Sequence, residues 1–419
     1  MTKHIHQVIV VGAGAAGLTV AHELARAGWH DVVVLEAQDY IGGRIKTAVD
    51  WGDPIELGAE FVHGSQIATW DYIQQLHAPA ITVGGKPKLI DRVGNEINAH
   101  EHAQYMRLND LVEQNGRPGV PISEISAAFG AALPHRVVEL VNDSVGDYEA
   151  GDADKLDSGA YSEMCRLTAG DGANHVLPHG YRQLIDFLAS KTRIETSTVV
   201  RAVDLTDPDL IAVTLDDHER LFAKHVVVTV PLGVLKSRVI TFIPELPASK
   251  QRAISRLGMG RALKYMLLFK TGELVRELFR MADGESASLQ TISNWWQSAS
   301  NHKVLVGFAG GKRHDKIAAM DEETLLDTVI DDLESMIDRP LRDQLVDSWL
   351  VRWDTNQFIR GAYSNHPVGV GLEEHALLAE PIDGRLFLAG EATNTSGNYA
   401  TVHGAIESGQ RVVKLLAGA

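Results

Sequence analysis

The sequence predicts an α/β protein whose first domain is built on a parallel sheet, and three observations near its start support this. Residues 8–11 are a short apolar run of β-branched side chains, which is typical of a buried parallel strand. A GxGxxG turn follows, and apolar residues then recur at helical spacing. A second apolar run, residues 32–35, ends at Glu36. This order of strand, glycine turn, helix and strand indicates a doubly wound α/β fold.

The glycine turn predicts a dinucleotide site. Gly12 permits a tight turn after the strand, and Gly14 lets the backbone approach a pyrophosphate. Gly17 allows the following helix to pack closely on the strand, so that the helix N-terminus faces the phosphates. Glu36, about 20 residues farther on, can accept hydrogen bonds from a ribose.

The residues after Glu36 indicate which dinucleotide binds. A second glycine pair, residues 42–43, precedes Arg44, whose guanidinium is placed to pair with a phosphate. The stretch 36–44 resembles the two-dinucleotide-binding motif of FAD enzymes rather than an NAD site. It predicts FAD as the cofactor.

Composition and charge narrow the class of protein. The 419 residues, 45% hydrophobic and 6% aromatic, are typical of a globular protein with two sizeable cores. No apolar run approaches the ~20 residues of a membrane span, and the first strand starts after about six residues, which leaves no room for a secretory signal. Cys165 is the only cysteine, so no intrachain disulfide forms. We therefore expect a cytoplasmic protein, a monomer or homodimer.

The formal net charge of −16 bears on partners. It results from 39 basic against 55 acidic residues, and it argues against nucleic acid and anionic membranes. It would suit a small cationic substrate, although many proteins are acidic simply for solubility.

The rest of the chain predicts a second domain inserted into the first in at least two pieces. Residues 86–171 are polar and mostly helical in pattern, with Pro121 and Pro134 marking helix starts. Residues 198–203 and 210–215 predict strands of a meander. The tail, a strand at 385–389 and then a helix, returns to the first domain. The predicted cofactor domain comprises 1–85, 172–245 and 355–419, and the substrate domain 86–171 and 246–354, with a first crossing at 84–87.

Two further patterns bear on metal binding and on a second dinucleotide site. His100-Glu101-His102 lacks the HExxH spacing of a zinc helix, so we expect a solvated charged turn there and no metal site in the chain. No second GxGxxG follows a strand. A reductase that uses NAD(P)H would normally carry one, so its absence favours an oxidase that is reoxidised by dioxygen.

Lys264 stands near the start of an apolar stretch, residues 263–269, that predicts a strand. An ammonium group there is costly unless a partner or a polar cavity receives it. The alternative is a strand-end lysine that extends to solvent.

Five separated stretches together resemble the flavin-dependent amine oxidases, the monoamine and polyamine oxidase superfamily. They are residues 12–44, 56–64, 258–269, 353–364 and 390–409. Within that family, residues 56–64 and 400–405 are most similar to polyamine and spermine oxidases. The resemblance implies a Rossmann-like FAD-binding domain with an interleaved α+β substrate domain.

The resemblance also implies roles for individual residues. Lys264 resembles the family lysine that holds a water at flavin N5. His63 resembles the histidine that faces the substrate cleft in animal polyamine oxidases, and Tyr363 matches one wall of the monoamine oxidase aromatic cage. These three are the expected catalytic residues. The residues expected to bind FAD are Gly12, Gly14, Ala15, Gly17, Glu36, Ala37, Gly43, Arg44, Gly58, Ala59, Glu60, Phe61, Val199, Trp353, Gly390, Glu391, Ala400, Thr401 and Val402.

Three positions depart from the family pattern. Ala362 stands where monoamine oxidases carry the cysteine that bonds flavin, so FAD is expected to be non-covalent. Thr401 replaces the second cage tyrosine, and His179 replaces a glycine. The resemblance implies oxidation of an amine, and these motifs favour a di- or polyamine. The product would be an imine that hydrolyses to an aldehyde, while dioxygen becomes hydrogen peroxide.

Other flavin-dependent classes stay open. An L-amino-acid oxidase would need a cleft arginine to pair with the substrate carboxylate, and Arg261 or Arg360 could serve. Thr401 counts against an aryl-monoamine oxidase, because it replaces the second tyrosine of the aromatic cage. A desaturase or porphyrinogen-type oxidase shares the FAD motifs, but Lys264 and the lack of a membrane-binding stretch count against it. A non-catalytic FAD-dependent binding protein is the remaining alternative.

Overall fold

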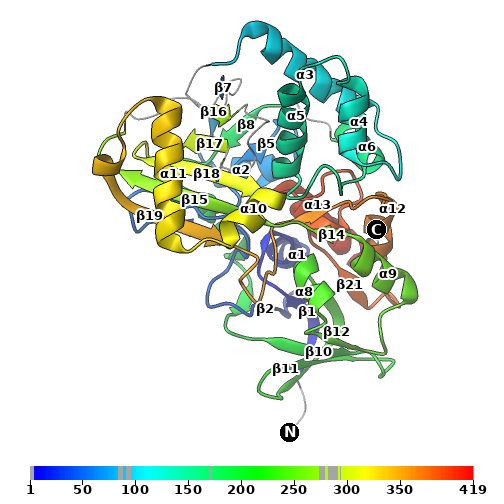
Figure 1. Ribbon diagram of the computed structural model, residues 1–419. Coiled ribbons are helices and arrows are strands. Elements are labelled where there is room, and N and C mark those ends of the chain that lie inside the picture. Colours follow the sequence, from blue (N-terminus) through cyan, green and yellow to red (C-terminus); the bar gives the residue numbers. More distant parts are fainter. Residues whose placement is uncertain are drawn as a thin grey trace.

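The computed structural model describes residues 4–83, 88–90, 96–168, 172–272, 279–281, 291–292 and 294–418. Figure 1 shows two sheets with separate sets of helices. The sheet nearer the N-terminus carries α1 (Ala15–Arg26), and the other carries α11 (Glu322–Ile337). A group of helices, α3 to α6, lies beside the second sheet.

The first sheet has a parallel core. Within the described residues, its eight strands run in the order β13-β10-β11-β12-β1-β2-β9, with β21 paired to β12. Strand β1 is parallel to both β2 and β12, and β12 is parallel to β21, so the two ends of the chain share one sheet. The predicted meander is confirmed, because β11 is antiparallel to β10 and β12. The strands are β1 (Ile5–Val11), β2 (Val32–Leu35), β9 (Arg193–Glu195), β10 (Val200–Asp204), β11 (Ile211–Leu215), β12 (Arg220–Val228), β13 (Thr241–Ile243) and β21 (Leu386–Leu388).

Both faces of this sheet are buried, which explains the continuous apolar runs of its central strands. Val8 and Val10 belong to one core cluster, and Ile9 and Val11 belong to another on the opposite face. Burying each such side chain contributes roughly 1.5–3 kcal/mol. Helices α2, α7 and α13 join α1 on one face, and α8, α9 and α12 lie against the other. Their bounds are α2 (Thr69–Leu76), α7 (Arg182–Ala189), α8 (Leu232–Ser237), α9 (Ala248–Arg256), α12 (Glu373–Ala379) and α13 (Val402–Leu416).

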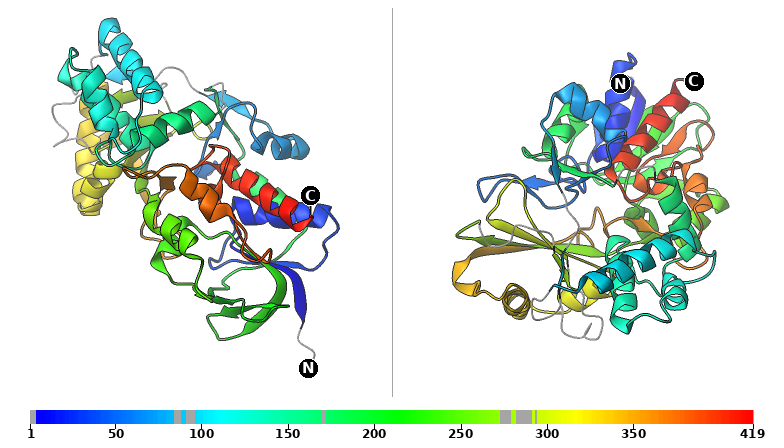
Figure 2. Two further views of the ribbon diagram at one scale, coloured as in Figure 1. Left: turned by 90° about the vertical axis from the view of Figure 1, so that its right-hand side faces the viewer. Right: turned by 90° about the horizontal axis from the view of Figure 1, so that it is seen from above.

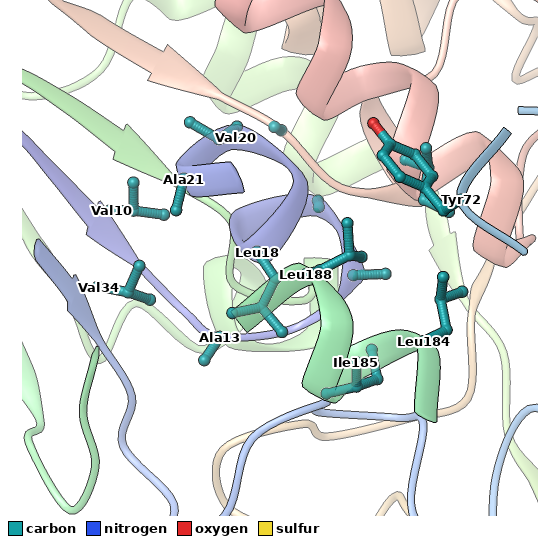
Figure 3. Packing of buried hydrophobic residues seen from close by; sticks show 14 of the residues in the cluster. Val10, Ala13, Leu18, Val20, Ala21, Val34, Tyr72, Leu184, Ile185 and Leu188 are labelled. Atoms are coloured by element: carbon teal, nitrogen blue, oxygen red, sulfur yellow. The ribbon is translucent and has the colours of Figure 1, made fainter. Parts of the chain in front are cut away.

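Helix α1 lies at the centre of the first core. Figure 3 shows Val10 and Val34 of the sheet on one side of it and Leu184 and Leu188 of α7 on another. Figure 2 shows α13, the last helix of the chain, beside α1. The two helices approach so closely that a Cβ on Gly409 would lie 2.7 Å from the Ala16 carbonyl oxygen.

The second sheet runs in the order β19-β15-β18-β17-β16-β7. Strand β15 lies between β19 and β18 and is antiparallel to both. Helix α11 covers one face, where Val329 and Leu333 share a core with Tyr265 and Leu267. The elements are β7 (Lys88–Ile90), β15 (Ala262–Phe269), β16 (Phe279–Met281), β17 (Asn294–Gln297), β18 (Val304–Gly310), α10 (Gly311–Ala318), the 3-10 helix η1 (Arg342–Gln344) and β19 (Leu345–Arg352).

The predicted helical segment forms α3 (Ala99–Gln114), α4 (Ile122–Phe129), α5 (His135–Tyr148) and α6 (Ser158–Leu167). Pro121 and Pro134 immediately precede α4 and α5, as predicted. The charged turn predicted at residues 100–102 is wrong, because these residues form the first turn of α3. The side chain of Asn98 accepts a hydrogen bond from the Glu101 amide at 3.0 Å and so caps the helix.

Short elements complete the structure. They are β3 (Thr47–Ala48) with β4 (Ile55–Glu56), the sheet of β5 (Val62–His63), β6 (Ile81–Val83) and β8 (Asn174–Val176), the pair β14 (Gly258–Met259) with β20 (Ser364–Asn365), and the 3-10 helix η2 (Glu391–Thr393). The predicted crossing at residues 84–87 lies outside the described residues. The four domain boundaries stay a prediction. Among the described residues, no helix is both long and apolar enough to cross a membrane.

Candidate active site

The first glycine turn has the conformation that its sequence predicts. Gly12 has φ +108°, and a Cβ on Gly17 would lie 2.0 Å from the Gly12 carbonyl oxygen, so neither position tolerates a side chain. No side chain caps α1 at Gly14, and no acidic residue occupies its first turn. A Cβ on Gly14 would meet only the Gly42 carbonyl oxygen, 3.9 Å away. The turn therefore offers helix amides and an open approach to an anion.

Glu36 lies directly after β2 and is 6% exposed. Its Oε2 accepts a hydrogen bond from the Ala13 amide at 2.7 Å, and its Oε1 accepts one from the Gln38 amide at 2.9 Å. Burial raises the pKa of this carboxyl, while the backbone hydrogen bonds oppose that shift. The Glu36 carbonyl accepts from the Thr198 amide at 2.8 Å, which brings Val199 beside this strand end. A cavity of about 510 Å³, lined by residues 37–39 and 355–358, adjoins it.

Arg44 joins the second glycine turn to the C-terminal segment. One guanidinium nitrogen, Nη1, donates to Glu391 Oε1 at 2.9 Å and to the Ala362 carbonyl at 2.6 Å. Glu391 Oε2 in turn accepts from Ser364 Oγ at 2.6 Å and from the Ala400 amide at 3.1 Å. Sequence reasoning assigned Arg44 and Glu391 to the cofactor separately and missed their ion pair. Pairing of Arg44 with a phosphate stays a prediction.

Gly58 and Ala59 pack directly on this turn. The Ala59 amide donates to the Arg44 carbonyl at 3.1 Å, and a Cβ on Gly58 would lie 1.8 Å from the same oxygen. That Cβ would also lie 3.2 Å from the ring of Trp353, whose Nε1 donates to the Leu57 carbonyl at 3.2 Å. Glycine is therefore required at position 58 by close backbone approach.

Lys264 points inward from β15 and is 8% exposed. Its Nζ donates to Glu60 Oε2 at 2.7 Å and to the Glu56 carbonyl at 3.1 Å. The other Glu60 oxygen accepts from the indole of Trp296 at 2.9 Å. The interpretation of Lys264 as a lysine that extends to solvent is therefore wrong. Sequence reasoning listed Glu60 for the cofactor and did not identify it as the partner of Lys264.

His63 and Phe61 extend from this centre. The Phe61 ring lies 5.6 Å from the Trp296 ring and 6.0 Å from the His63 ring. His63 Nδ1 donates to Asn174 Oδ1 at 2.7 Å. The ring keeps an accessible surface, yet the protein around it desolvates the charged form and lowers the pKa of His63.

Tyr363 reaches the same centre from the C-terminal segment. Its hydroxyl donates to the Tyr148 carbonyl at 2.6 Å, and Tyr363 and Phe308 both pack against the small cluster of Ala150, Ala262 and Ala362. Phe308 is the partner of Lys264 in the β15–β18 register. His63 and Lys264 are thus linked through Phe61, Trp296 and Glu60. The catalytic roles of His63, Lys264 and Tyr363 stay a prediction.

Glu149 was not predicted from the sequence. It follows the last turn of α5, and its carbonyl accepts from the Asn365 side chain at 3.0 Å. Its carboxylate has no cationic partner among the residues that the structure describes, and burial raises its pKa to about 7. Burial and then the charge of Glu149 raise the pKa of Tyr363. A charged residue directly after a helix normally indicates solvent, so the sequence carried no signal for this one.

Thr401 has a local role as well. Its Oγ1 accepts from the Gly404 amide at 2.9 Å and donates to the Asn398 carbonyl at 2.8 Å, which caps α13. Val402 is the first residue of that helix, and Gly390 directly precedes η2. Nothing in the structure explains His179.

Comparison with known proteins settles the family. A family model described as flavin containing amine oxidoreductase matches residues 15–417. The chain belongs to this family. As a member of the flavin-containing amine oxidoreductases, it is an enzyme with a flavin cofactor, and the resemblance noted in its motifs is confirmed.

Within this amine oxidoreductase family, curated relatives include plant proteins. Polyamine oxidase 2 of Arabidopsis thaliana is 29% identical over 431 residues, covering 96% of this chain and 86% of that protein. Polyamine oxidase 4 of Oryza sativa subsp. japonica is 27% identical with the same coverage. Wild-type putrescine oxidase solved with putrescine has a TM-score of 0.83 at 19% identity and full coverage of both chains. That likeness confirms the predicted fold class.

Proposed function

We propose that this amine oxidoreductase binds FAD without a covalent bond and oxidises a di- or polyamine. The product is an imine that hydrolyses to an aldehyde, and dioxygen is reduced to hydrogen peroxide. The observation that carries the substrate class is Glu149, a half-buried carboxylate whose charged form the surrounding protein desolvates, without a cationic partner among the described residues and beside Tyr363. A desolvated anion of this kind favours a substrate with a second, cationic amino group.

The residues at the first sheet fit a dinucleotide. Glu36 offers carboxylate oxygens for a ribose, and the uncapped N-terminus of α1 offers amides for a pyrophosphate. Ala37 and Val199 adjoin the same strand end. When bound, the flavin accepts two electrons from the amine and passes them to dioxygen.

The side chains around Lys264 supply positioning and charge. Two acceptors, Glu60 Oε2 and the Glu56 carbonyl, fix the ammonium and leave it one further donor for a water. The amine that reacts must be a free base, because a protonated nitrogen has no lone pair to assist loss of hydride from the adjacent carbon. Glu149 would hold the second amino group in its charged form and so orient the substrate.

The surroundings of the two candidate arginines, Arg261 and Arg360, favour an amine substrate over an amino-acid substrate. Arg261 is exposed and donates to Asp315 at 2.7 Å. Arg360 is exposed, and its Nε donates to the Gln357 carbonyl at 2.9 Å. Neither observation supports an arginine that receives a substrate carboxylate. The cytoplasmic location and the monomeric or dimeric state stay predictions.

Glu149→Gln is expected to raise KM for a diamine by about 10- to 150-fold, because one charge-assisted contact of about 1.5–3 kcal/mol is lost. For a monoamine of the same chain length, the same substitution should raise KM much less. Steady-state kinetics with both substrates measure this difference. Glu163→Gln, which removes an exposed carboxylate of α6, is the matched control and should change neither KM. An equal loss for both amines would contradict the assignment.

The affinity for a diamine should also depend on pH through Glu149. Its pKa of about 7 means that the carboxylate charge, and hence its attraction for a cation, is lost as the pH falls through 7. The ratio of KM in Glu149→Gln to KM in the wild type should therefore be large above pH 7 and decline toward one below it. Using the ratio cancels the titration of the amine itself. A ratio that is flat with pH would exclude this role.

FAD is expected to be released intact on denaturation, because Ala362 provides no thiol for a covalent bond. Acid precipitation should leave the yellow colour in the supernatant, and the intact mass of the polypeptide should equal that of its sequence. A yellow pellet, or a mass increased by one flavin, would refute this prediction.

A further inference from the structure

We propose that His4, His6 and Asp31 form a binding site for one divalent transition-metal ion of the zinc type. The site lies where the chain enters β1 and β2. One ligand atom from each of the three residues lies within 4.8 Å of the others. The residues come from two separate segments, which only the fold brings together.

The donor atoms converge on one point. His6 Nδ1 lies 2.8 Å from Asp31 Oδ1, and His4 Nε2 lies 3.2 Å from each oxygen of the same carboxylate. A tetrahedral zinc ion with bonds of about 2.0–2.1 Å separates its ligands by roughly 3.3–3.5 Å. Small outward rotations of the side chains would therefore admit an ion. The two histidines alternate along an extended strand, so both project from one face, with ring centroids 4.5 Å apart.

The surroundings hold the ligands in place. The Asp31 carbonyl accepts from the Gln7 amide at 3.0 Å and from the Val8 amide at 3.3 Å. The Asp31 amide donates to Gln7 Oε1 at 3.2 Å. These bonds fix the backbone that carries the carboxylate. The His6 side chain is 7% exposed, whereas that of His4 is 68% exposed, so a bound ion keeps one open side for a water.

The donor set selects the class of ion. Two imidazoles and one carboxylate suit Zn²⁺, Co²⁺, Ni²⁺ or Cu²⁺, whereas Mg²⁺ and Ca²⁺ prefer oxygen ligands alone. No metal site was predicted from the sequence, where only His100-Glu101-His102 was considered as a ligand motif. His6 and Asp31 are 25 residues apart in the sequence, and only the fold brings them together.

The position of the site in the first sheet indicates a structural role for a bound ion. Strands β1 and β2 are parallel, and the glycine turn and Glu36 follow their carboxyl ends. The histidines and Asp31 lie at the amino ends of these two strands, which Figure 1 labels β1 and β2. A bound ion would therefore connect the amino ends of β1 and β2 and stabilise the folded chain, at the opposite end of these strands from the predicted cofactor site.

Zinc titration of the untagged holoenzyme after removal of metals with a chelator tests the site. Calorimetry should detect one equivalent of Zn²⁺, and Co²⁺ should give the visible absorption of a protein-bound ion. His4→Ala and Asp31→Asn should weaken binding at least ~10-fold, since each removes one ligand. His30→Ala removes an exposed histidine next to Asp31 and is the matched control, with binding unchanged. His6 is left intact because it is buried.

Thermal unfolding provides a second measurement that does not depend on activity. Zn²⁺ should raise Tm in the wild type and in His30→Ala, and should not raise it in His4→Ala or Asp31→Asn. Absence of saturable binding by the wild type would overturn the proposal. Binding that survives both ligand substitutions unchanged would overturn it too, and would indicate that the histidines and Asp31 are joined only by hydrogen bonds.

Discussion

Lys264→Met should turn over amines at least ~10-fold more slowly than the wild type, which corresponds to ~1.4 kcal/mol of barrier. Methionine approximates the length of the lysine stem but removes the charge and all three donors. The water that the ammonium would hold near the flavin loses its donor. Stopped-flow measurement of the reductive and oxidative half-reactions would show which step is slowed.

The ion pair with Glu60 changes how this variant must be designed. Both side chains are 9% exposed, so Lys264→Met alone leaves a buried carboxylate without its cation, at a cost of about 3–5 kcal/mol. The double variant Lys264→Met/Glu60→Gln removes both charges and should restore stability while activity stays low. Lys270→Met, at an exposed position directly after the same strand, is the control and should behave as the wild type. Wild-type rates in the folded double variant would remove Lys264 from the reaction.

Glu36→Ala should weaken FAD binding by about 1.5–3 kcal/mol, or roughly 10- to 150-fold in Kd, because a charge-assisted contact to the ribose is lost. The substitution also deprives the amides of Ala13 and Gln38 of their acceptor, so the glycine turn itself should loosen. Both effects reduce flavin retention. Titration of the apoprotein with FAD measures the change.

Glu36→Gln separates these two effects, since its side-chain oxygen can still accept one of the two amides. It should retain the fold of the turn and show an intermediate affinity. Asp209→Ala, which removes an exposed carboxylate between β10 and β11, is the control and should bind FAD normally. Unchanged affinity in Glu36→Ala would show that the end of β2 does not contact the ribose.

The sequence predicted the parts of the fold that depend on local signals. Alternating burial of Val8 to Val11 on two faces, the glycine turn at Gly12 and Gly17, and Pro121 before α4 all act over a few residues. The same local reasoning was wrong at residues 100–102, where an asparagine cap starts a helix in a polar stretch.

The contacts that define the candidate site join residues that lie far apart in the sequence. Glu60 meets Lys264 across 204 residues of sequence, and Arg44 meets Glu391 across 347. Such pairs depend on how the two sheets are placed, and no spacing rule encodes that placement. Glu149 could not be predicted for the same reason, because the lack of a cationic partner among the described residues depends on how the chain folds.

Anaerobic mixing of the oxidised enzyme with a panel of amines tests the proposed function most directly. A diamine or polyamine should bleach the yellow flavin absorption faster than benzylamine or any L-amino acid does. Admission of dioxygen should then restore the colour and release hydrogen peroxide. Flavin that stays yellow with every amine, or that is bleached fastest by an L-amino acid, would exclude the oxidation of di- or polyamines as the function.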